Sequence, residues 1–249
     1  MMDKFDVGII DLEIYVPMFY VEQSDLEHHD CCDGKYVNGL GQTRMAVPSL
    51  VEDPVSMALT VVHRLMERVN LDYRLIGRLD VGTESSIDLS KSIKSQIMQL
   101  FQGSGNYSVE GADNINACYG GTAALFNVIN WVRHTSNGSL GLVVTTDIAI
   151  YSNDESSARA TGGAAAVCML IGHNPILSIE VPCGSYMNNC YDFYKPLAIP
   201  YPMFDAKQSQ IIYIKSLIKC SSEYMKSANF SLFDPKNLFA LHCPLCKAR

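Results

Sequence analysis

Apolar and polar positions along the chain form segments that predict strands and helices in turn. Continuous apolar runs rich in β-branched residues are typical of strands covered on both faces, and the clearest is 140–150. Apolar residues at helical spacing after Asp53 predict an amphipathic helix over 54–69, because Asp favours the N-cap and Pro the first turn. The other predicted strands are 7–15, 79–83, 107–115, 164–171, 176–181 and 238–241, and the other predicted helices are 92–101, 120–132 and 208–227.

This alternation of strands with helices is typical of a layered α/β fold in which helices cover a buried sheet. The stretch 186–205 is irregular and rich in Tyr and Pro, and it predicts a long ordered loop. The chain stops soon after the last predicted strand, with no closing element.

Composition and charge exclude several classes of protein. Apolar residues make up 48% of the 249 positions, enough to bury a substantial core, which excludes a disordered chain. The net charge of −7 argues against a nucleic-acid partner. A membrane-spanning helix needs about 18 apolar residues in succession, and no such run occurs. Because the N-terminus resembles neither a signal peptide nor a transit peptide, we expect a cytoplasmic protein without a membrane partner.

The nine cysteines are odd in number and follow no export signal, so we expect reduced thiols rather than a disulfide framework. Cys243 and Cys246 form a Cys-x-x-Cys pair, but a structural zinc site normally needs a second pair of ligands at matching spacing. We therefore expect no metal.

Cys118 has the sequence context of a nucleophile. It follows a predicted strand and precedes Gly120 and Gly121, which open a predicted helix. The positive end of that helix is expected to lower the pKa of the thiol, and the glycines let other backbone approach closely. A buried, inert cysteine beside a tight turn is the alternative.

Glu84 and His242 also follow apolar strand candidates. A carboxylate at the end of a buried strand suits acid–base chemistry, although a solvated loop carboxylate is the simpler interpretation. His242 has the most site-like setting of the six histidines. The Gly-rich pattern of a dinucleotide site and the P-loop of a nucleotide-binding protein are both missing from the sequence.

Several motifs resemble those of eukaryotic hydroxymethylglutaryl-CoA synthases, which belong to the thiolase superfamily. The matching stretches are VGI at 7–9, LEIY at 12–15, GKY at 34–36, GLGQ at 39–42, MER at 66–68, IGRL at 76–79, VGTE at 81–84, NACYGGTAA at 116–124, GG at 162–163, YDFYKP at 191–196, His242, Pro244, Cys246 and Lys247. The resemblance implies a thiolase-like α/β fold with an N-terminal half at 5–175 and the beginning of a C-terminal half at 176–249, which is incomplete.

The resemblance also implies an acyltransferase mechanism in which acetyl-CoA and acetoacetyl-CoA are substrates and no cofactor is used. Cys118 would take the acetyl group, Glu84 would act as acid and base, and His242 would hold acetoacetyl-CoA. The expected product, HMG-CoA, belongs to the mevalonate route to isoprenoids and sterols. Further substrate and CoA contacts implied by the motifs are Asp33, Gly34, Tyr119, Asp147, Thr161, Asp192, Ser209 and Lys247.

Departures from the family pattern leave a second interpretation open. Ala160 replaces a family proline, and Cys243 and Leu245 change the motif around His242. Family members are roughly twice this length, so long apolar strands would lack part of their cover. The complete protein is expected to form a homodimer. The alternative is a catalytically silent, truncated paralogue or isoform that at most associates with a full-length subunit. A thiolase or ketoacyl synthase would share the cysteine but explains Glu84 poorly.

Overall fold

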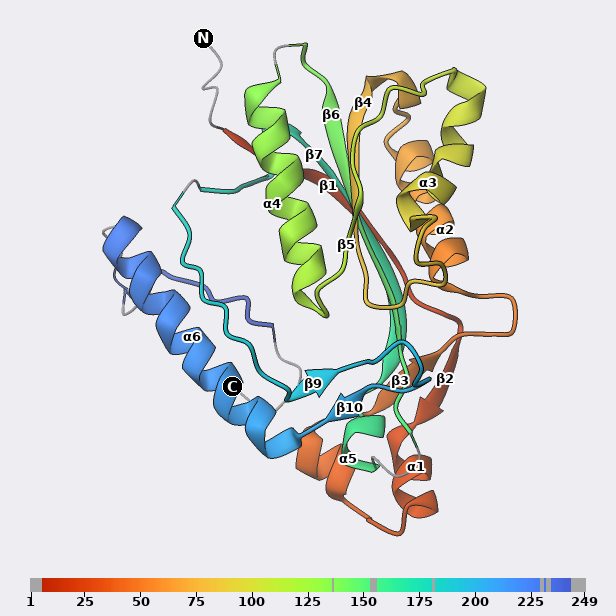
Figure 1. Cartoon of the computed structure of the whole chain (residues 1–249), viewed down its shortest axis with the longest axis vertical. Coiled ribbons are helices and arrows are strands. Elements are labelled where there is room, and N and C mark those ends of the chain that lie inside the picture. Colours follow the sequence, from red (N-terminus) through yellow and green to blue (C-terminus); the bar gives the residue numbers. More distant parts are fainter. Residues whose placement is uncertain are drawn as a thin grey trace. The chain divides into compact units, whose positions relative to one another are not determined.

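The computed structural model describes residues 6–135, 137–152, 156–180, 182–228, 231 and 234–242. The chain gathers into two compact units, and each unit is made of several segments of sequence (Figure 1). The first unit consists of Met1–Phe19, Ala46–Ala149 and Ala164–Ile179, and the second of Tyr20–Met45, Ile150–Gly163 and Glu180–Arg249. The halves predicted from the sequence, 5–175 and 176–249, are continuous stretches of chain, whereas each compact unit is built from separate segments. The division into halves stays a prediction.

A sheet forms the centre of the first unit, and the described residues give it the strand order β5-β4-β6-β7-β1-β8. The strands are β1 (Val7–Tyr15), β4 (Ile76–Gly82), β5 (Asp113–Asn114), β6 (Leu140–Ala149), β7 (Gly163–His173) and β8 (Leu177–Ser178). β4 pairs in parallel with both β5 and β6, whereas β1 pairs antiparallel with β7 and β8. The carboxyl ends of β4, β5 and β6 therefore meet at one edge of the sheet.

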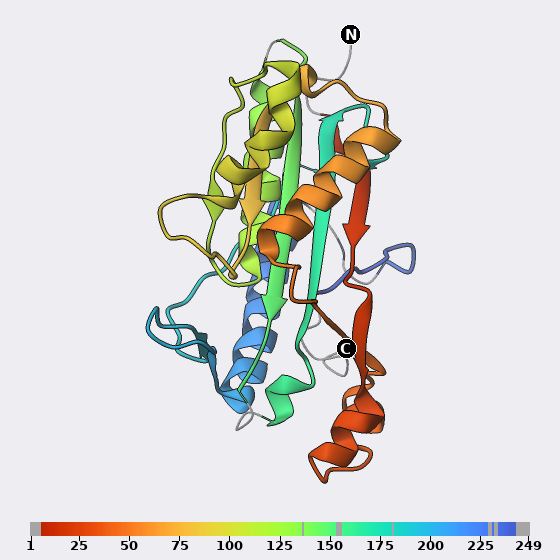
Figure 2. The ribbon, with the colours of Figure 1, turned by 90° about the vertical axis from the view of Figure 1, so that its right-hand side faces the viewer.

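Helices cover both faces of this sheet (Figures 1 and 2). α2 (Pro54–Arg68), α3 (Ile93–Ile97) and the 3₁₀ helix η3 (Met98–Ser104) lie on one face, and α4 (Tyr119–His134) lies on the other. Because side chains alternate along a strand, Leu142 and Val144 pack with the α2 face while Val143 packs with the α4 face. The layered α/β fold predicted from the sequence is confirmed, and so is the strand covered on both faces.

Local sequence explains why α2 begins where it was predicted to begin. The Asp53 carboxylate accepts a hydrogen bond from the backbone N–H of Ser56 at 2.6 Å, and the Ser56 hydroxyl accepts one from the backbone N–H of Asp53 at 2.8 Å. This reciprocal capping box satisfies two backbone donors that the helix leaves unpaired. Pro54 occupies the first helical position, where its missing N–H is not needed.

The second unit contains shorter elements, most of which the hydrophobic pattern does not predict. They are β2 (Phe19–Glu22), α1 (Gln23–His29), the π-helix η1 (Lys35–Leu40), β3 (Arg44–Val47), α5 (Ser156–Arg159), β9 (Phe193–Tyr194), β10 (Met203–Phe204) and α6 (Ala206–Ala228). α6 confirms the helix predicted over 208–227. The predicted loop over 186–205 contains an antiparallel ladder, in which Met203 lies opposite Tyr194.

The strand predicted over 238–241 is wrong, because those described residues have no regular secondary structure. Leu238 is 97% exposed, and the segment pairs with no neighbouring strand among the described residues. An apolar run forms a strand only where another strand satisfies its backbone groups.

The strand predicted over 107–115 is reduced to Asp113–Asn114. Gly111 interrupts it with a φ of 125°, and a side chain there would meet the carbonyl of Leu79. Within the described part of the run predicted over 176–181, which ends at residue 180, Leu177–Ser178 alone form a strand. No helix in the described part of the chain is both long and apolar enough to cross a membrane.

Candidate active site

Glu84, Asp147 and Cys118 lie at the edge where β4, β5 and β6 end. The backbone N–H of Glu84 donates a hydrogen bond to Asp147 Oδ1 at 2.8 Å, so the ends of β4 and β6 are directly connected. Thr83 Oγ1 also lies 3.0 Å from Asp147 Oδ1. The backbone N–H of Thr83 donates to the carbonyl of Asn114 at 3.2 Å, which ties β4 to the strand that leads to Cys118. The parallel sheet thus brings three distant parts of the sequence to one place.

The turn that carries Cys118 is compressed against the sheet. Cys118 occupies the N-cap position of α4, and Ala117 before it has a φ of 39°, a left-handed conformation that costs a residue with a side chain about 1–2 kcal/mol. A Cβ atom on Gly120 would lie 2.5 Å from the carbonyl oxygen of Asn114, and one on Gly121 would lie 2.7 Å from Thr145 Cγ2. The expectation that these glycines allow close approach is confirmed.

The expected direction of the Cys118 pKa is wrong. Although Cys118 is exposed by its surface area, desolvation by the surrounding protein raises the pKa of its thiol to about 11, and the nearby carboxylates of Glu84 and Asp147 add to the rise. The sequence prediction considered only the positive end of α4 and included neither desolvation nor these charges. Cys118 therefore needs a proton acceptor before it can act as a nucleophile.

Asp147 is a half-buried carboxylate at this edge. Burial raises its pKa, while hydrogen bonds from the backbone N–H of Glu84, from Thr83 and from Ser85 oppose the rise. A carboxyl group with a raised pKa accepts a proton more readily than a solvated aspartate does. Tyr119, the neighbouring predicted contact, is 48% exposed at the start of α4.

Three other predicted positions lie in the second unit, on two turns joined by an ion pair. Gly34, next to the exposed Asp33, adopts a φ of 78° at the N-cap position of η1. Thr161 lies in the turn after α5, where its backbone N–H donates to the carbonyl of Ala158 at 2.9 Å. Between the turns, Arg159 donates to the carboxylate of Asp30.

Sequence reasoning missed the role of Asp30. Its carboxylate also accepts a hydrogen bond from the Tyr36 hydroxyl at 2.7 Å, so it joins η1 to the turn after α5. Arg159 holds the pKa of Asp30 well below its usual range. No local pattern distinguishes Asp30 from other helix-end aspartates, because its partner Arg159 comes from a distant segment.

Asp192 and Ser209 are both attached to Asp205 in the second unit. The backbone N–H of Asp205 donates to the carbonyl of Asp192 at 2.8 Å, and that of Ser209 donates to the carbonyl of Asp205 at 2.9 Å. His242 is exposed, and its main-chain carbonyl accepts a hydrogen bond from the Tyr213 hydroxyl at 2.7 Å. That these residues reach Cys118 stays a prediction. Cys243, Cys246 and Lys247 lie outside the described residues.

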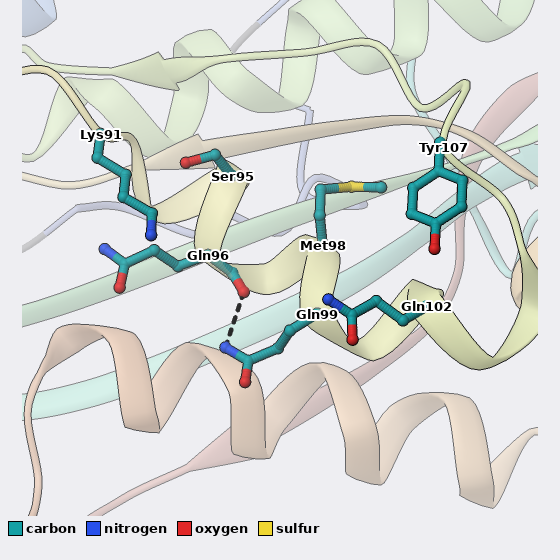
Figure 3. Close-up of a pocket in the computed structure, with 7 residues that line it drawn as sticks. All are labelled: Lys91, Ser95, Gln96, Met98, Gln99, Gln102 and Tyr107. Carbon is teal, nitrogen blue, oxygen red and sulfur yellow. Dashed lines mark hydrogen bonds between the residues drawn. The ribbon is translucent and has the colours of Figure 1, made fainter.

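A separate pocket of about 310 Å³ lies on α3 and η3 (Figure 3). Its lining residues are Lys91, Ser95, Gln96, Met98, Gln99, Gln102 and Tyr107. Gln99 Nε2 donates to the carbonyl of Gln96 at 2.9 Å, and none of the lining residues belongs to the predicted site. Within the described residues, no group of three or more His, Cys, Asp or Glu side chains is placed to hold a metal ion.

Comparison with known proteins matches almost the whole of this chain to one family. A family model described as "Hydroxymethylglutaryl-coenzyme A synthase N terminal" matches residues 4–175, and one described as "Hydroxymethylglutaryl-coenzyme A synthase C terminal" matches residues 178–248. The mitochondrial hydroxymethylglutaryl-CoA synthase of Homo sapiens is 48% identical over 257 residues, which cover 97% of this chain and 50% of that protein. The cytoplasmic hydroxymethylglutaryl-CoA synthase of Gallus gallus is 49% identical over 257 residues, which cover 97% of this chain and 49% of that protein.

A solved structure supports the same assignment. MvaS in complex with 3-hydroxy-3-methylglutaryl coenzyme A superposes with a TM-score of 0.89 at 31% sequence identity, covering 98% of this chain and 60% of that chain. This chain spans about half the length of the curated relatives it matches. From its sequence motifs, its thiolase-like fold and these matches, we conclude that the chain belongs to the hydroxymethylglutaryl-CoA synthase family.

Proposed function

We propose that this protein condenses acetyl-CoA with acetoacetyl-CoA through an acetyl-Cys118 intermediate and then hydrolyses that intermediate, giving HMG-CoA and CoA. The observation that carries this proposal is the meeting of Cys118, Glu84 and Asp147 at one sheet edge. A thiol beside two carboxylates provides a nucleophile together with groups that accept and return protons.

In the first step, the Cys118 sulfur attacks the carbonyl carbon of acetyl-CoA. The thiol carries its proton at neutral pH, because its pKa is raised to about 11, so a neighbouring carboxylate has to accept that proton. Asp147 suits this task because burial raises its own pKa. The bond between the acetyl carbon and the CoA sulfur then breaks, and CoA leaves with the proton that Cys118 lost.

In the second step, Glu84 removes a proton from the methyl group of the acetyl thioester. The resulting carbanion attacks the ketone carbon of acetoacetyl-CoA, and the protonated Glu84 returns its proton to the new alkoxide. Water then cleaves the bond between Cys118 and the product, which restores the thiol. Dividing the reaction into acylation, condensation and hydrolysis replaces one high barrier by several lower ones.

Residues of both units have binding roles in this proposal. His242 would hold and polarise acetoacetyl-CoA, and Lys247 would contact the CoA phosphates. Asp33, Gly34, Thr161 and Ser209 would contact CoA, while Tyr119, Asp147 and Asp192 would line the pocket. We also propose a cytoplasmic location, a homodimer and a place in isoprenoid and sterol synthesis. The similar proteins bear both cytoplasmic and mitochondrial names.

Mass spectrometry after incubation with acetyl-CoA tests the proposal. We expect one acetyl group on Cys118, and we expect Cys118→Ala to lose it while Cys183→Ala, which removes an exposed cysteine of the second unit, keeps it. CoA release on addition of acetoacetyl-CoA then reports condensation. An unmodified Cys118 in the folded chain would overturn the proposal. It would favour a silent family member that associates with a longer subunit, an alternative supported by the half-length match.

A further inference from the structure

Asn114, the last residue of β5, contacts the strand that carries Glu84. Its side-chain Nδ2 donates to the carbonyl of Val81 at 3.2 Å and to Asp80 Oδ2 at 3.4 Å. Its own carbonyl accepts the backbone N–H of Thr83 at 3.2 Å. The side chain of Asn114 therefore binds the end of β4, and its main chain binds Thr83, the residue just before Glu84.

Asn114 also contacts the helix that begins at Cys118. Asn127 of α4 donates through Nδ2 to Asn114 Oδ1 at 3.0 Å and to Asp80 Oδ2 at 3.3 Å. At the start of the helix, Gly120 lies so close to the Asn114 carbonyl that a Cβ atom there would come within 2.5 Å. Asn114 is thus held to α4 at the helix start and again farther along the helix.

The anchor of this network is the buried carboxylate of Asp80. Asp80 is 1% exposed. Its carboxylate also accepts hydrogen bonds from Arg78, whose Nε lies 3.0 Å from Oδ1. A buried carboxylate without partners would be unfavourable by several kcal/mol, so the network has one strongly preferred arrangement. Asp80, Asn114 and Asn127 come from β4, β5 and α4, the elements that position Glu84 and Cys118.

We propose that Asn114 is a positioning residue, which through Asp80 and Asn127 holds the Cys118 turn in register with the end of β4 that carries Glu84. Cys118 follows Asn114 by four residues, and Glu84 follows Asp80 by four. The left-handed Ala117 lies between Asn114 and Cys118, and such a conformation persists only where the surrounding structure imposes it. The inference rests on the proposed role of Cys118 but concerns its placement, which is measured without turnover.

The test is the rate at which iodoacetamide alkylates Cys118 as a function of pH. The tryptic peptide 95–133 contains Cys118 as its single cysteine, so mass spectrometry follows this thiol separately from the other eight. We expect Asn114→Ala and Asn127→Ala to lower the apparent pKa by about one unit, because the sulfur moves away from the carboxylates and gains water. At pH 8 the alkylation rate then rises roughly tenfold, since the rate follows the thiolate fraction.

Asn130→Ala is the matched control, because Asn130 lies exposed on the same helix outside the network. Its alkylation profile is expected to equal that of the unchanged protein. If Asn114→Ala fails to fold, as judged by thermal unfolding, Asn127→Ala decides the question. Folded variants whose profiles match the control would overturn the inference. A chain that takes no acetyl group would overturn the proposed function, whereas the alkylation profiles would still decide the role of Asn114.

Discussion

The two units of the molecule position their candidate functional residues in different ways. In the first unit, Glu84, Cys118 and Asp147 lie at the ends of buried elements, and packing on both faces of the sheet determines where they are. In the second unit, the candidate residues lie on turns and irregular segments, apart from Ser209 in the first turn of α6. The long helix α6 buries none of its described residues, and it exposes Ile211, Ile214 and Ile218.

This difference shows that burial both positions groups and changes their acidity. Desolvation raises the pKa values of Cys118 and Asp147 at the sheet edge. In the second unit, a polar contact has both of these roles, because Arg159 lowers the pKa of Asp30 and joins two turns. Substitutions in the first unit should therefore affect chemistry and stability together, whereas those in the second unit should act through individual contacts.

The largest expected effect is that of Glu84→Gln on condensation. The amide keeps the size of the side chain but cannot take the methyl proton, so HMG-CoA formation is expected to fall by about 10²–10⁴-fold. Acetylation of Cys118 should persist, which separates the two steps. The control is Glu67→Gln, which changes an exposed carboxylate of α2 and should alter neither acetylation nor condensation. Condensation at an unchanged rate in Glu84→Gln would remove Glu84 from the mechanism.

The next largest effect is expected on the free energy of unfolding, which we compare for one substitution in each unit. Leu142 in β6 is fully buried, and Leu142→Ala is expected to lower the free energy of unfolding by about 3 kcal/mol through lost burial and a cavity. Ile218 in α6 is 62% exposed, so Ile218→Ala should change the free energy of unfolding by less than about 0.5 kcal/mol. Urea denaturation measures both. Equal losses would mean that α6 is packed as tightly in solution as the sheet, and the contrast between the units would fail.

A smaller effect is expected when the ion pair of the second unit is broken. Arg159→Ala leaves the carboxylate of Asp30 without its main partner and should lower stability at pH 7 by about 1–3 kcal/mol. Arg159 depresses the folded-state pKa of Asp30, so the stabilisation is complete above the unfolded pKa of about 3.9 and is lost as pH falls below it. The difference between variant and unchanged protein should therefore shrink in acid.

Arg74→Ala is the control for this prediction. Arg74 pairs with Asp72 on the surface, and its side chain is 72% exposed. Such pairs contribute about 0–1 kcal/mol. If thermal unfolding gave the same loss for both arginine variants at pH 7, the Asp30 pair would have no special role in the second unit.

The smallest effect concerns the acidity of Cys118. Asp147→Asn keeps an oxygen to accept the N–H of Glu84 but removes a charge that raises the pKa of the thiol, so that pKa should fall by less than about one unit. The pH dependence of Cys118 alkylation measures the shift. Asp113→Asn is the control, because its carboxylate accepts N–H groups of α3 instead. An unchanged Asp147→Asn profile would leave desolvation and the Glu84 charge as the causes.

Local pattern predicted the elements that depend on local contacts. The capping box at Asp53, the helix after Cys118 and the doubly covered strand β6 follow from short stretches of sequence. The strand predicted over 238–241 failed because a strand depends on a partner that local pattern does not contain. The predicted direction of the Cys118 pKa shift failed for the same reason, since the segments that desolvate the thiol and the carboxylates of Glu84 and Asp147 come from other parts of the chain.

By itself, the sequence determined the type and order of the main elements, the layered α/β class and the family resemblance on Cys118, Glu84 and His242. Tertiary structure alone decided that Cys118 and Glu84 share an edge with the half-buried Asp147, that their surroundings raise the pKa of the thiol, and that Asn114 links the elements carrying them. Periodicity and capping act within a few residues, whereas desolvation and charge depend on which distant segments the fold brings together.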